Sequence, residues 1–299
     1  MAWVKRIGFF FLTNIAIMAT ISIIINLLGV GNYFTKTGIN YQSLLIFCTL
    51  WGMGGSFISL LLSKSMAKWS MGVQVIDPSR ATGSEGELVD MVKRLSMAAR
   101  IPMPEVGIYD SPELNAFATG ASRKSSLVAV SSGLLNSMNK NEVEGVIGHE
   151  LTHISNGDMV TMVLIQGVVN AFAMFLSRIL SFVISTALQR GDNDSSPYLI
   201  RMVLTIVFDI VFSILGSLVV SFFSRVREFK ADLGSARIAG KDRMISALQA
   251  LQRNMDVPAD KRGAAIASLK ISGKKGFLRL FSTHPALEDR IAALQKARV

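Results

Sequence analysis

The sequence predicts an α+β membrane protein that is mostly helical. It would have four hydrophobic transmembrane helices and a domain outside the membrane that contains a small antiparallel sheet. Half of the 299 residues are hydrophobic, and the mean hydropathy of +0.43 is too high for an ordinary soluble domain. The apolar residues are gathered into four long runs. The β-prone stretches are short and lie between the second and third runs.

The four apolar runs are residues 7–30, 41–63, 159–188 and 198–223. Each is long enough to cross a hydrocarbon core of about 30 Å as a helix. Lys5 and Arg6 precede the first run, as in a secretory signal, but the run is longer than a signal core and no cleavage site follows it. We therefore interpret the first run as an uncleaved anchor.

These runs divide the chain into four parts. Residues 1–63 form a two-helix membrane anchor, and residues 159–223 form two further hydrophobic helices. Residues 64–158 and 224–299 lie outside the membrane, and we expect them to fold together as one domain. The single cysteine, Cys48, lies in the second run, forms no internal disulfide, and fits a reducing compartment.

The net charge of +10 is placed beside the apolar runs rather than along a stripe. By the positive-inside rule, this placement puts both termini and both extramembrane parts in the cytoplasm. Acidic lipid head groups are then the expected partners of the basic flanks. Without a basic stripe interleaved with aromatic residues, the pattern argues against nucleic-acid binding. The flanking residues on the cytoplasmic side are Lys5, Arg6, Lys64, Lys68, Arg80, Arg225, Arg227 and Lys230.

Charged residues within the third and fourth runs leave several interpretations open. Arg178 and Arg201 could extend to the far interface, or Asp209 could pair with an arginine inside the helix bundle. A third interpretation is that these two helices lie partly outside the membrane.

The first extramembrane part begins with a predicted helix over residues 84–100, because apolar residues recur there with helical period. Short β-prone stretches at 106–109, 115–119 and 127–130 then predict the antiparallel sheet. A second helix begins near Asn139, with Glu142 as its capping partner, and ends at Asn156 and Gly157. This helix leads almost directly into the third apolar run, so we expect a site on it to lie close to the membrane.

The second helix carries the most informative motif, His-Glu-Leu-Thr-His at residues 149–153, with two of the chain's three histidines. Positions i and i+4 share one face of a helix, so His149 and His153 can bind one zinc ion together. Glu150 is then offset to reach a water molecule beside the metal, as in metalloproteases. Chance occurrence on a charged face is the alternative. The apolar flanking residues instead indicate a buried helix, where these polar groups need a metal or hydrogen bonds.

A catalytic zinc site usually takes three protein ligands, and Glu228 is the candidate for the third. Asp232 follows on the same helical face, where it could accept a hydrogen bond from a ligand imidazole. The alternative is that both acids pair with neighbouring Arg225, Arg227 or Lys230 on a solvated helix.

These motifs resemble those of the HtpX family of bacterial membrane zinc metalloproteases, which is related to the CAAX prenyl proteases. The resemblance covers essentially the whole chain and rests on residues 115–120, 149–158, 228–232 and 283–290. Lys230 is one departure, since some relatives have histidine there. The resemblance implies a gluzincin-type site in which His149, His153 and Glu228 bind one Zn²⁺ per chain and Glu150 is the catalytic base. It also implies a multi-pass protein of the bacterial inner membrane that removes damaged membrane proteins under stress, with its site facing the cytoplasm.

Further site residues follow from the requirements of peptide hydrolysis. His284 suits the second electrophile that stabilises the oxyanion, although a histidine before Pro285 can also cap or pack locally. Arg290 would position His284 or pair with Glu288.

Substrate binding is predicted at an edge strand that contains Asn115, Ala116, Phe117 and Ala118. An extended peptide could add to such an edge by main-chain hydrogen bonds, which would tolerate many sequences. The alternative is an ordinary sheet strand.

The sequence thus predicts a zinc endopeptidase that cuts misfolded or damaged membrane proteins. One rival is a non-proteolytic membrane chaperone or scaffold with a structural metal, which would not need Glu150 beside an open coordination position. A transporter is the other rival. It would need polar residues across several spans, whereas the first two runs contain no ionisable residue after Arg6.

Overall fold

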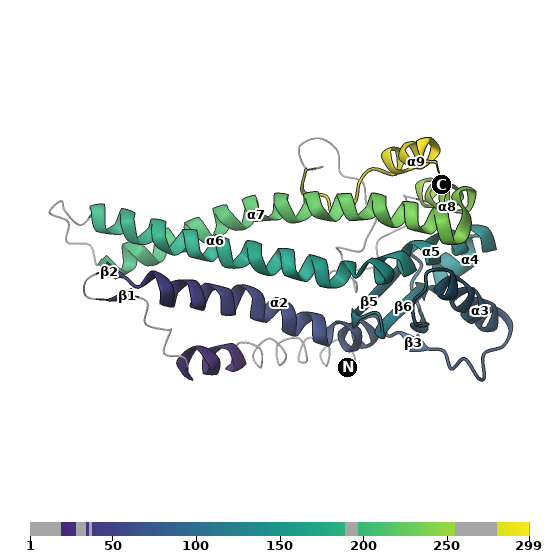
Figure 1. Ribbon diagram of the computed structural model, residues 1–299, viewed down its shortest axis with the longest axis horizontal. Helices are drawn as coiled ribbons and strands as arrows, with labels where there is room; N and C mark the ends of the chain where they lie inside the picture. The colour runs from purple at the N-terminus through teal and green to yellow at the C-terminus, as the bar shows by residue number, and fades with distance from the viewer. Residues whose placement is uncertain (1–18, 28–33, 36–37, 189–196, 255–279, 299) are drawn as a thin grey trace. The chain divides into compact units, whose positions relative to one another are not determined.

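The computed structural model describes residues 19–27, 34–35, 38–188, 197–254 and 280–298. It separates into two compact units (Figure 1). The first contains Met1–Ser59 and Val163–Val220, and the second contains Leu60–Met162 and Ser221–Val299.

Three helices in the described residues are long and apolar enough to cross a membrane. They are α2 (Tyr41–Met71), α6 (Asp158–Leu188) and a helix that begins with α7 (Pro197–Ser235). Their apolar portions lie side by side in the first unit (Figure 1). A short hairpin of β1 (Phe34–Thr35) and β2 (Gly38–Ile39) precedes α2. Most of the first predicted transmembrane helix, 7–30, lies outside the described residues, although 19–27 are helical.

A charged pair joins two of these helices. The Nη1 atom of Arg178 on α6 lies 3.2 Å from Oδ1 of Asp209 on α7. Ser177 also donates a hydrogen bond across the same interface to the carbonyl oxygen of Thr205, at 3.0 Å. Of the interpretations that the sequence left open, the structure supports the one in which Asp209 pairs with an arginine between helices.

The second unit contains a four-stranded sheet of β3 (Gln74–Val75), β4 (Glu105–Tyr109), β5 (Ala116–Ser122) and β6 (Ser125–Ser131), in the order β3-β4-β6-β5. The prediction of an antiparallel sheet is wrong, because β4 and β6 run parallel while the other two pairs are antiparallel. The six-residue connection after β4 takes β5 to the outer edge of the sheet rather than back along β4. The β5–β6 hairpin then inserts β6 between them, parallel to β4.

Helices cover this sheet and form the core of the unit. They are α3 (Gly83–Ala98), α4 (Ser132–Ser137), α5 (Lys140–Asn156), the π-helical turn η1 (Ala236–Gly240), α8 (Lys241–Arg253) and α9 (Leu287–Lys296). The main core cluster joins apolar residues of α3, β4, β5, β6, α5 and α8, including Leu95, Val128, Ile147 and Ala247. Helix α5 is thus packed on both sides, which fixes the face that carries the motif.

Candidate metal centre

Helix α5 begins and ends where the sequence predicts. The Asn139 side chain accepts hydrogen bonds from the backbone N–H groups of Asn141 and Glu142, and the Glu142 carboxylate accepts one in return from the Asn139 N–H. This capping box satisfies N–H groups that the first helical turn leaves free. At the other end, Gly157 adopts the left-handed conformation (φ +70°) that terminates many helices.

Close packing brings the later helix onto α5. A methyl group added at Gly148 would lie 2.6 Å from the Ser235 hydroxyl oxygen and 3.0 Å from the Ala239 side chain. Ser235 also donates a hydrogen bond to the Gly145 carbonyl oxygen at 2.8 Å. Only a residue without a side chain permits this approach at Gly148. The approach holds α7 against the helix that bears both histidines.

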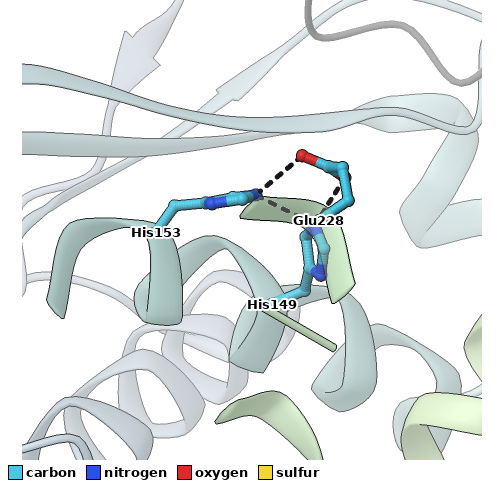
Figure 2. A group of neighbouring side chains, drawn as sticks. All are labelled: His149, His153 and Glu228. Atoms are coloured by element: carbon cyan, nitrogen blue, oxygen red, sulfur yellow. Dashed lines mark hydrogen bonds and ion pairs between the residues drawn. The ribbon is translucent and has the colours of Figure 1, made fainter. Parts of the chain in front are cut away.

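The three predicted ligands converge at this contact. The two imidazole Nε2 atoms are 3.0 Å apart. The Glu228 oxygens lie 3.3 Å from each of them, Oε2 from His149 and Oε1 from His153. Figure 2 shows the two rings extending from one helix toward the Glu228 carboxylate. All three side chains are buried, so the alternative of a solvated helix face for Glu228 does not apply.

The other ring nitrogen of each histidine faces a carboxylate. Nδ1 of His149 is 3.0 Å from Oδ1 of Asp232, and Nδ1 of His153 is 2.6 Å from Oδ2 of Asp158. Each Nδ1 is therefore placed to donate a hydrogen bond to its carboxylate, and each Nε2 is the nitrogen directed at the other two ligands. Two Nε2 atoms and a carboxylate directed at one point suit a bound cation.

The residues fit zinc in donor type and in spacing. Two imidazole nitrogens and one carboxylate are a common ligand set for catalytic zinc. Tetrahedral ligands with bonds of about 2.0–2.1 Å lie about 3.3–3.4 Å from one another, which agrees with the 3.0–3.3 Å separations of these atoms. Burial lowers the pKa of His149, but hydrogen bonds to Asp232 and Glu228 outweigh burial and raise that pKa to about 9. The site thus attracts positive charge.

Asp232 lies where the sequence predicts, and Arg290 binds it. The Arg290 guanidinium donates to both Asp232 oxygens, from Nε at 2.8 Å and from Nη2 at 2.5 Å. Arg290 is 1 % exposed. Burial lowers its pKa, but the Asp232 carboxylate more than compensates and raises it, so the arginine stays charged. From the sequence, Arg290 is expected to position His284 or to pair with Glu288. In the structure, Arg290 binds the Asp232 carboxylate, which in turn contacts Nδ1 of His149.

His284 contacts the metal ligands from the segment 280–284, which is bound to α7. Its Nδ1 atom lies 2.9 Å from Oε2 of Glu228. Arg225 fixes the segment by donating to the carbonyl oxygens of Leu280 and Ser282, at 2.8 and 2.9 Å. The N-cap of α9 is Ala286, so His284 does not cap that helix.

A small cavity of about 30 Å³ adjoins the three ligands. Glu150 and Asn115 line it, as do His284 and Arg227. From the sequence, Arg227 is expected at the membrane flank or, in the alternative interpretation, as an ion-pair partner of Glu228. Its Nη2 atom donates to Oε1 of Glu228 at 3.1 Å.

The predicted substrate-binding strand forms β5, at one edge of the sheet, with Asn115 just before it. Ala116 and Ala118 are buried in the main core, and Phe117 packs against Tyr109 with ring centroids 5.6 Å apart. These three side chains face protein, so peptide binding there would use the main chain. The Asn115 side chain is partly exposed at the cavity.

Asp158 is the residue that sequence reasoning missed. It is buried and stands five positions after His153, directly after the helix-ending glycine. The signal in the sequence is the glycine-aspartate pair just after the motif. It contributes to the family resemblance and ends the helix, but it had no assigned role at the metal site.

Comparisons with known proteins agree with this geometry. Peptidase family M48 matches residues 83–298. A "Protease HtpX homolog" from Janthinobacterium sp. (strain Marseille) is 50 % identical over 292 residues, 97 % of this chain and 99 % of the relative. "Protease HtpX" from Aeromonas hydrophila subsp. hydrophila is 49 % identical over 297 residues, with 97 % and 99 % covered.

A solved structure shares the fold. The crystal structure of S. mikatae Ste24p aligns with 97 % of this chain and 67 % of its own, with a TM-score of 0.60 and 18 % identity. The family match, the close relatives and the three convergent ligands lead to one conclusion. The chain belongs to Peptidase family M48 and is a membrane zinc metalloprotease homologous to HtpX.

Proposed function

We propose that this protease is an endopeptidase for misfolded or damaged membrane proteins, and that it acts at the cytoplasmic face of the bacterial inner membrane. The observation that carries the proposal is the cavity shared by Glu150 and the three metal ligands. A carboxylate beside the ligands, but not among them, is what hydrolysis needs and what a structural metal site does not.

His149, His153 and Glu228 would hold one zinc ion, which supplies Lewis-acid activation of water and of a peptide carbonyl. Glu150 takes the proton of the attacking water and delivers it to the leaving amide nitrogen. The Glu150 carboxylate thus carries the proton from the water to the leaving nitrogen. Asp232 and Arg290 keep the His149 ring in the orientation that this step requires.

His284 is proposed to stabilise the negative charge that develops on the carbonyl oxygen. Its position on Glu228, at 2.9 Å, places it at the rim of the ligand group. Arg225 supports this role because it holds the segment that bears His284. The His284 side chain is therefore already in place, and it does not have to move when the negative charge forms on the carbonyl oxygen.

Substrate would bind as an extended segment along β5. An added strand uses main-chain hydrogen bonds, which do not depend on side-chain identity. The Asn115 amide, at the cavity, would hold the segment near Glu150. Such tolerance suits an enzyme that removes damaged proteins of many sequences. The predicted cytoplasmic orientation of the basic flanks supports the proposed location.

Glu150→Gln tests the proposed mechanism. The variant keeps the size of the side chain and removes its ability to accept a proton. Purified wild type and variant would be compared for cleavage of an unfolded membrane protein in detergent micelles, with zinc content measured on the same samples. We expect cleavage to fall at least about 10²-fold, the usual contribution of a general base, while zinc content stays unchanged. Retained cleavage would contradict the role of Glu150.

The substrate class is tested separately with matched substrates. The same membrane protein would be supplied folded and heat-unfolded, and a soluble protein would be supplied unfolded. We expect the unfolded membrane protein to be cut fastest. Equal rates on the unfolded soluble protein would contradict the preference for membrane proteins, without bearing on Glu150.

A further inference from the structure

Asp158, the first residue of α6, lies against one of the metal ligands. Its Oδ2 atom is 2.6 Å from Nδ1 of His153, and both residues are buried, with exposed fractions of 8 % and 7 %. The short separation is typical of a charge-assisted hydrogen bond. Asp158 belongs to the stretch that carries the family resemblance, but it had no predicted role at the metal site.

The turn between α5 and α6 creates this contact. Helix α5 ends at Asn156, and Gly157 takes the left-handed conformation with its N–H bonded to the Ile154 carbonyl oxygen at 3.1 Å. This reversal lets a residue five positions after His153 return to its ring. In a continuous helix, a residue at that spacing would face away from His153.

We propose that Asp158 is a positioning residue that sets the tautomer and orientation of His153. By accepting the Nδ1 proton, Asp158 leaves the Nε2 lone pair directed at His149 and Glu228, 3.0 and 3.3 Å away. The negative charge also raises the basicity of the ring toward a metal. The pair thus repeats on His153 the arrangement that Asp232 makes on His149. The inference rests on the zinc site of the proposed function.

A purely structural role makes a different prediction. An acid in the first turn of a helix stabilises it through the helix dipole by about 0.3–1 kcal/mol. If that were the only role, removing Asp158 would lower stability and leave the metal site intact. Asp242 offers a matched control. It is an exposed acid in the first turn of α8. Within the described part of the chain, no hydrogen bond or ion pair joins it to a metal ligand.

The test uses full-length protein in detergent, stripped of metal and titrated with zinc against a competing chelator. We expect Asp158→Ala to weaken zinc binding about 10- to 100-fold, as loss of such partners usually does. Asp158→Asn should lie between Ala and wild type, because its amide oxygen still accepts the Nδ1 proton without the charge. Asp242→Asn should bind zinc like the wild type. Thermal unfolding of each variant shows whether it is folded.

A second measurement determines the tautomer of the His153 ring directly. With only three histidines in the chain, nitrogen NMR of ¹⁵N-histidine-labelled, metal-free protein resolves each ring. We expect the Nδ1–H form of His153 to dominate in wild type and to lose that dominance in Asp158→Ala. Wild-type zinc affinity and an unchanged tautomer in Asp158→Ala would overturn the proposal, as would equal weakening in Asp242→Asn. If wild type itself bound no zinc, the proposed function would fail, and the His153 tautomer would still decide the role of Asp158.

Discussion

Arg290 illustrates how the metal centre depends on residues that are not themselves metal ligands. It is buried and donates two short hydrogen bonds to the oxygens of one carboxylate, Asp232, and its Nη1 atom lies 3.6 Å from Oε2 of Glu228. Asp232 in turn holds His149. A buried ion pair of this kind contributes little net stability when intact, but leaves an uncompensated charge when one partner is removed.

We therefore expect Arg290→Met to destabilise the protein by about 3–5 kcal/mol. The double variant Arg290→Met with Asp232→Asn should recover part of that loss, because it removes both charges of the Arg290–Asp232 pair. Denaturant unfolding in detergent, with zinc removed, measures all three proteins and Asp232→Asn alone.

If the losses of the two single variants simply add in the double, the two residues are not coupled and the arrangement behind His149 is misassigned. A second readout is zinc affinity, which should fall in every variant of the pair.

At the residue scale, sequence reasoning succeeded where partners lie on one helix. His149, Glu150 and His153 are four positions apart or fewer, so their shared face follows from helix geometry alone. Asp232 was found in the same way from Glu228. Asp158 and the true partner of Arg290 were missed, because one depends on a left-handed turn at Gly157 and the other on where α9 packs.

Among the elements, the contact between α5 and the end of α7 determines the site. Glu228 can reach the histidines only because Gly148 and Ser235 allow the backbones to approach closely. The π-helical turn η1 follows immediately, and turns of this kind are often found near functional sites.

Gly148→Ala should weaken zinc binding at least tenfold while the protein still folds. The added methyl group would meet Ser235 at 2.6 Å, and relieving the clash moves α7 and Glu228 away from α5. Gly55→Ala is the control, since its methyl group would have no neighbour within 4 Å. Chelator competition measures both variants. Unchanged zinc affinity in Gly148→Ala would show that the helix contact does not set the ligand spacing.

For the secondary-structure elements, the sequence predicts the bounds of helices better than the order of strands. Helix bounds follow from local signals, and the capping residues Asn139, Glu142 and Gly157 behave as predicted. Strand order does not, because it depends on which strands meet in three dimensions. The parallel pairing of β4 with β6 arises from β5 passing to the edge, and nothing in the six-residue connection indicates that choice.

For the whole molecule, the central question is which side of the membrane holds the protease unit. From the placement of basic residues, we predict that this unit lies in the cytoplasm and that Asn40, just before α2, lies on the other side. The single cysteine makes the question accessible, because Cys48→Ser removes the only native thiol.

In that background, we expect Lys124→Cys to react with a membrane-impermeant maleimide in inverted vesicles but not in intact spheroplasts. Lys124 lies exposed in the turn between β5 and β6. Asn40→Cys, exposed just before α2, should show the reverse pattern. Labelling of Lys124→Cys in spheroplasts would place the protease unit outside the cytoplasm and refute the proposed location.

The most direct measurement is the zinc content of the purified chain by mass spectrometry, with three variants alongside. We predict one zinc ion per chain in wild type, in Glu150→Gln and in Glu85→Ala, an exposed acid in the first turn of α3. Glu228→Ala should retain little or none, because two imidazoles alone hold the ion weakly. Full zinc content in Glu228→Ala would contradict the three-ligand centre on which the proposed chemistry depends.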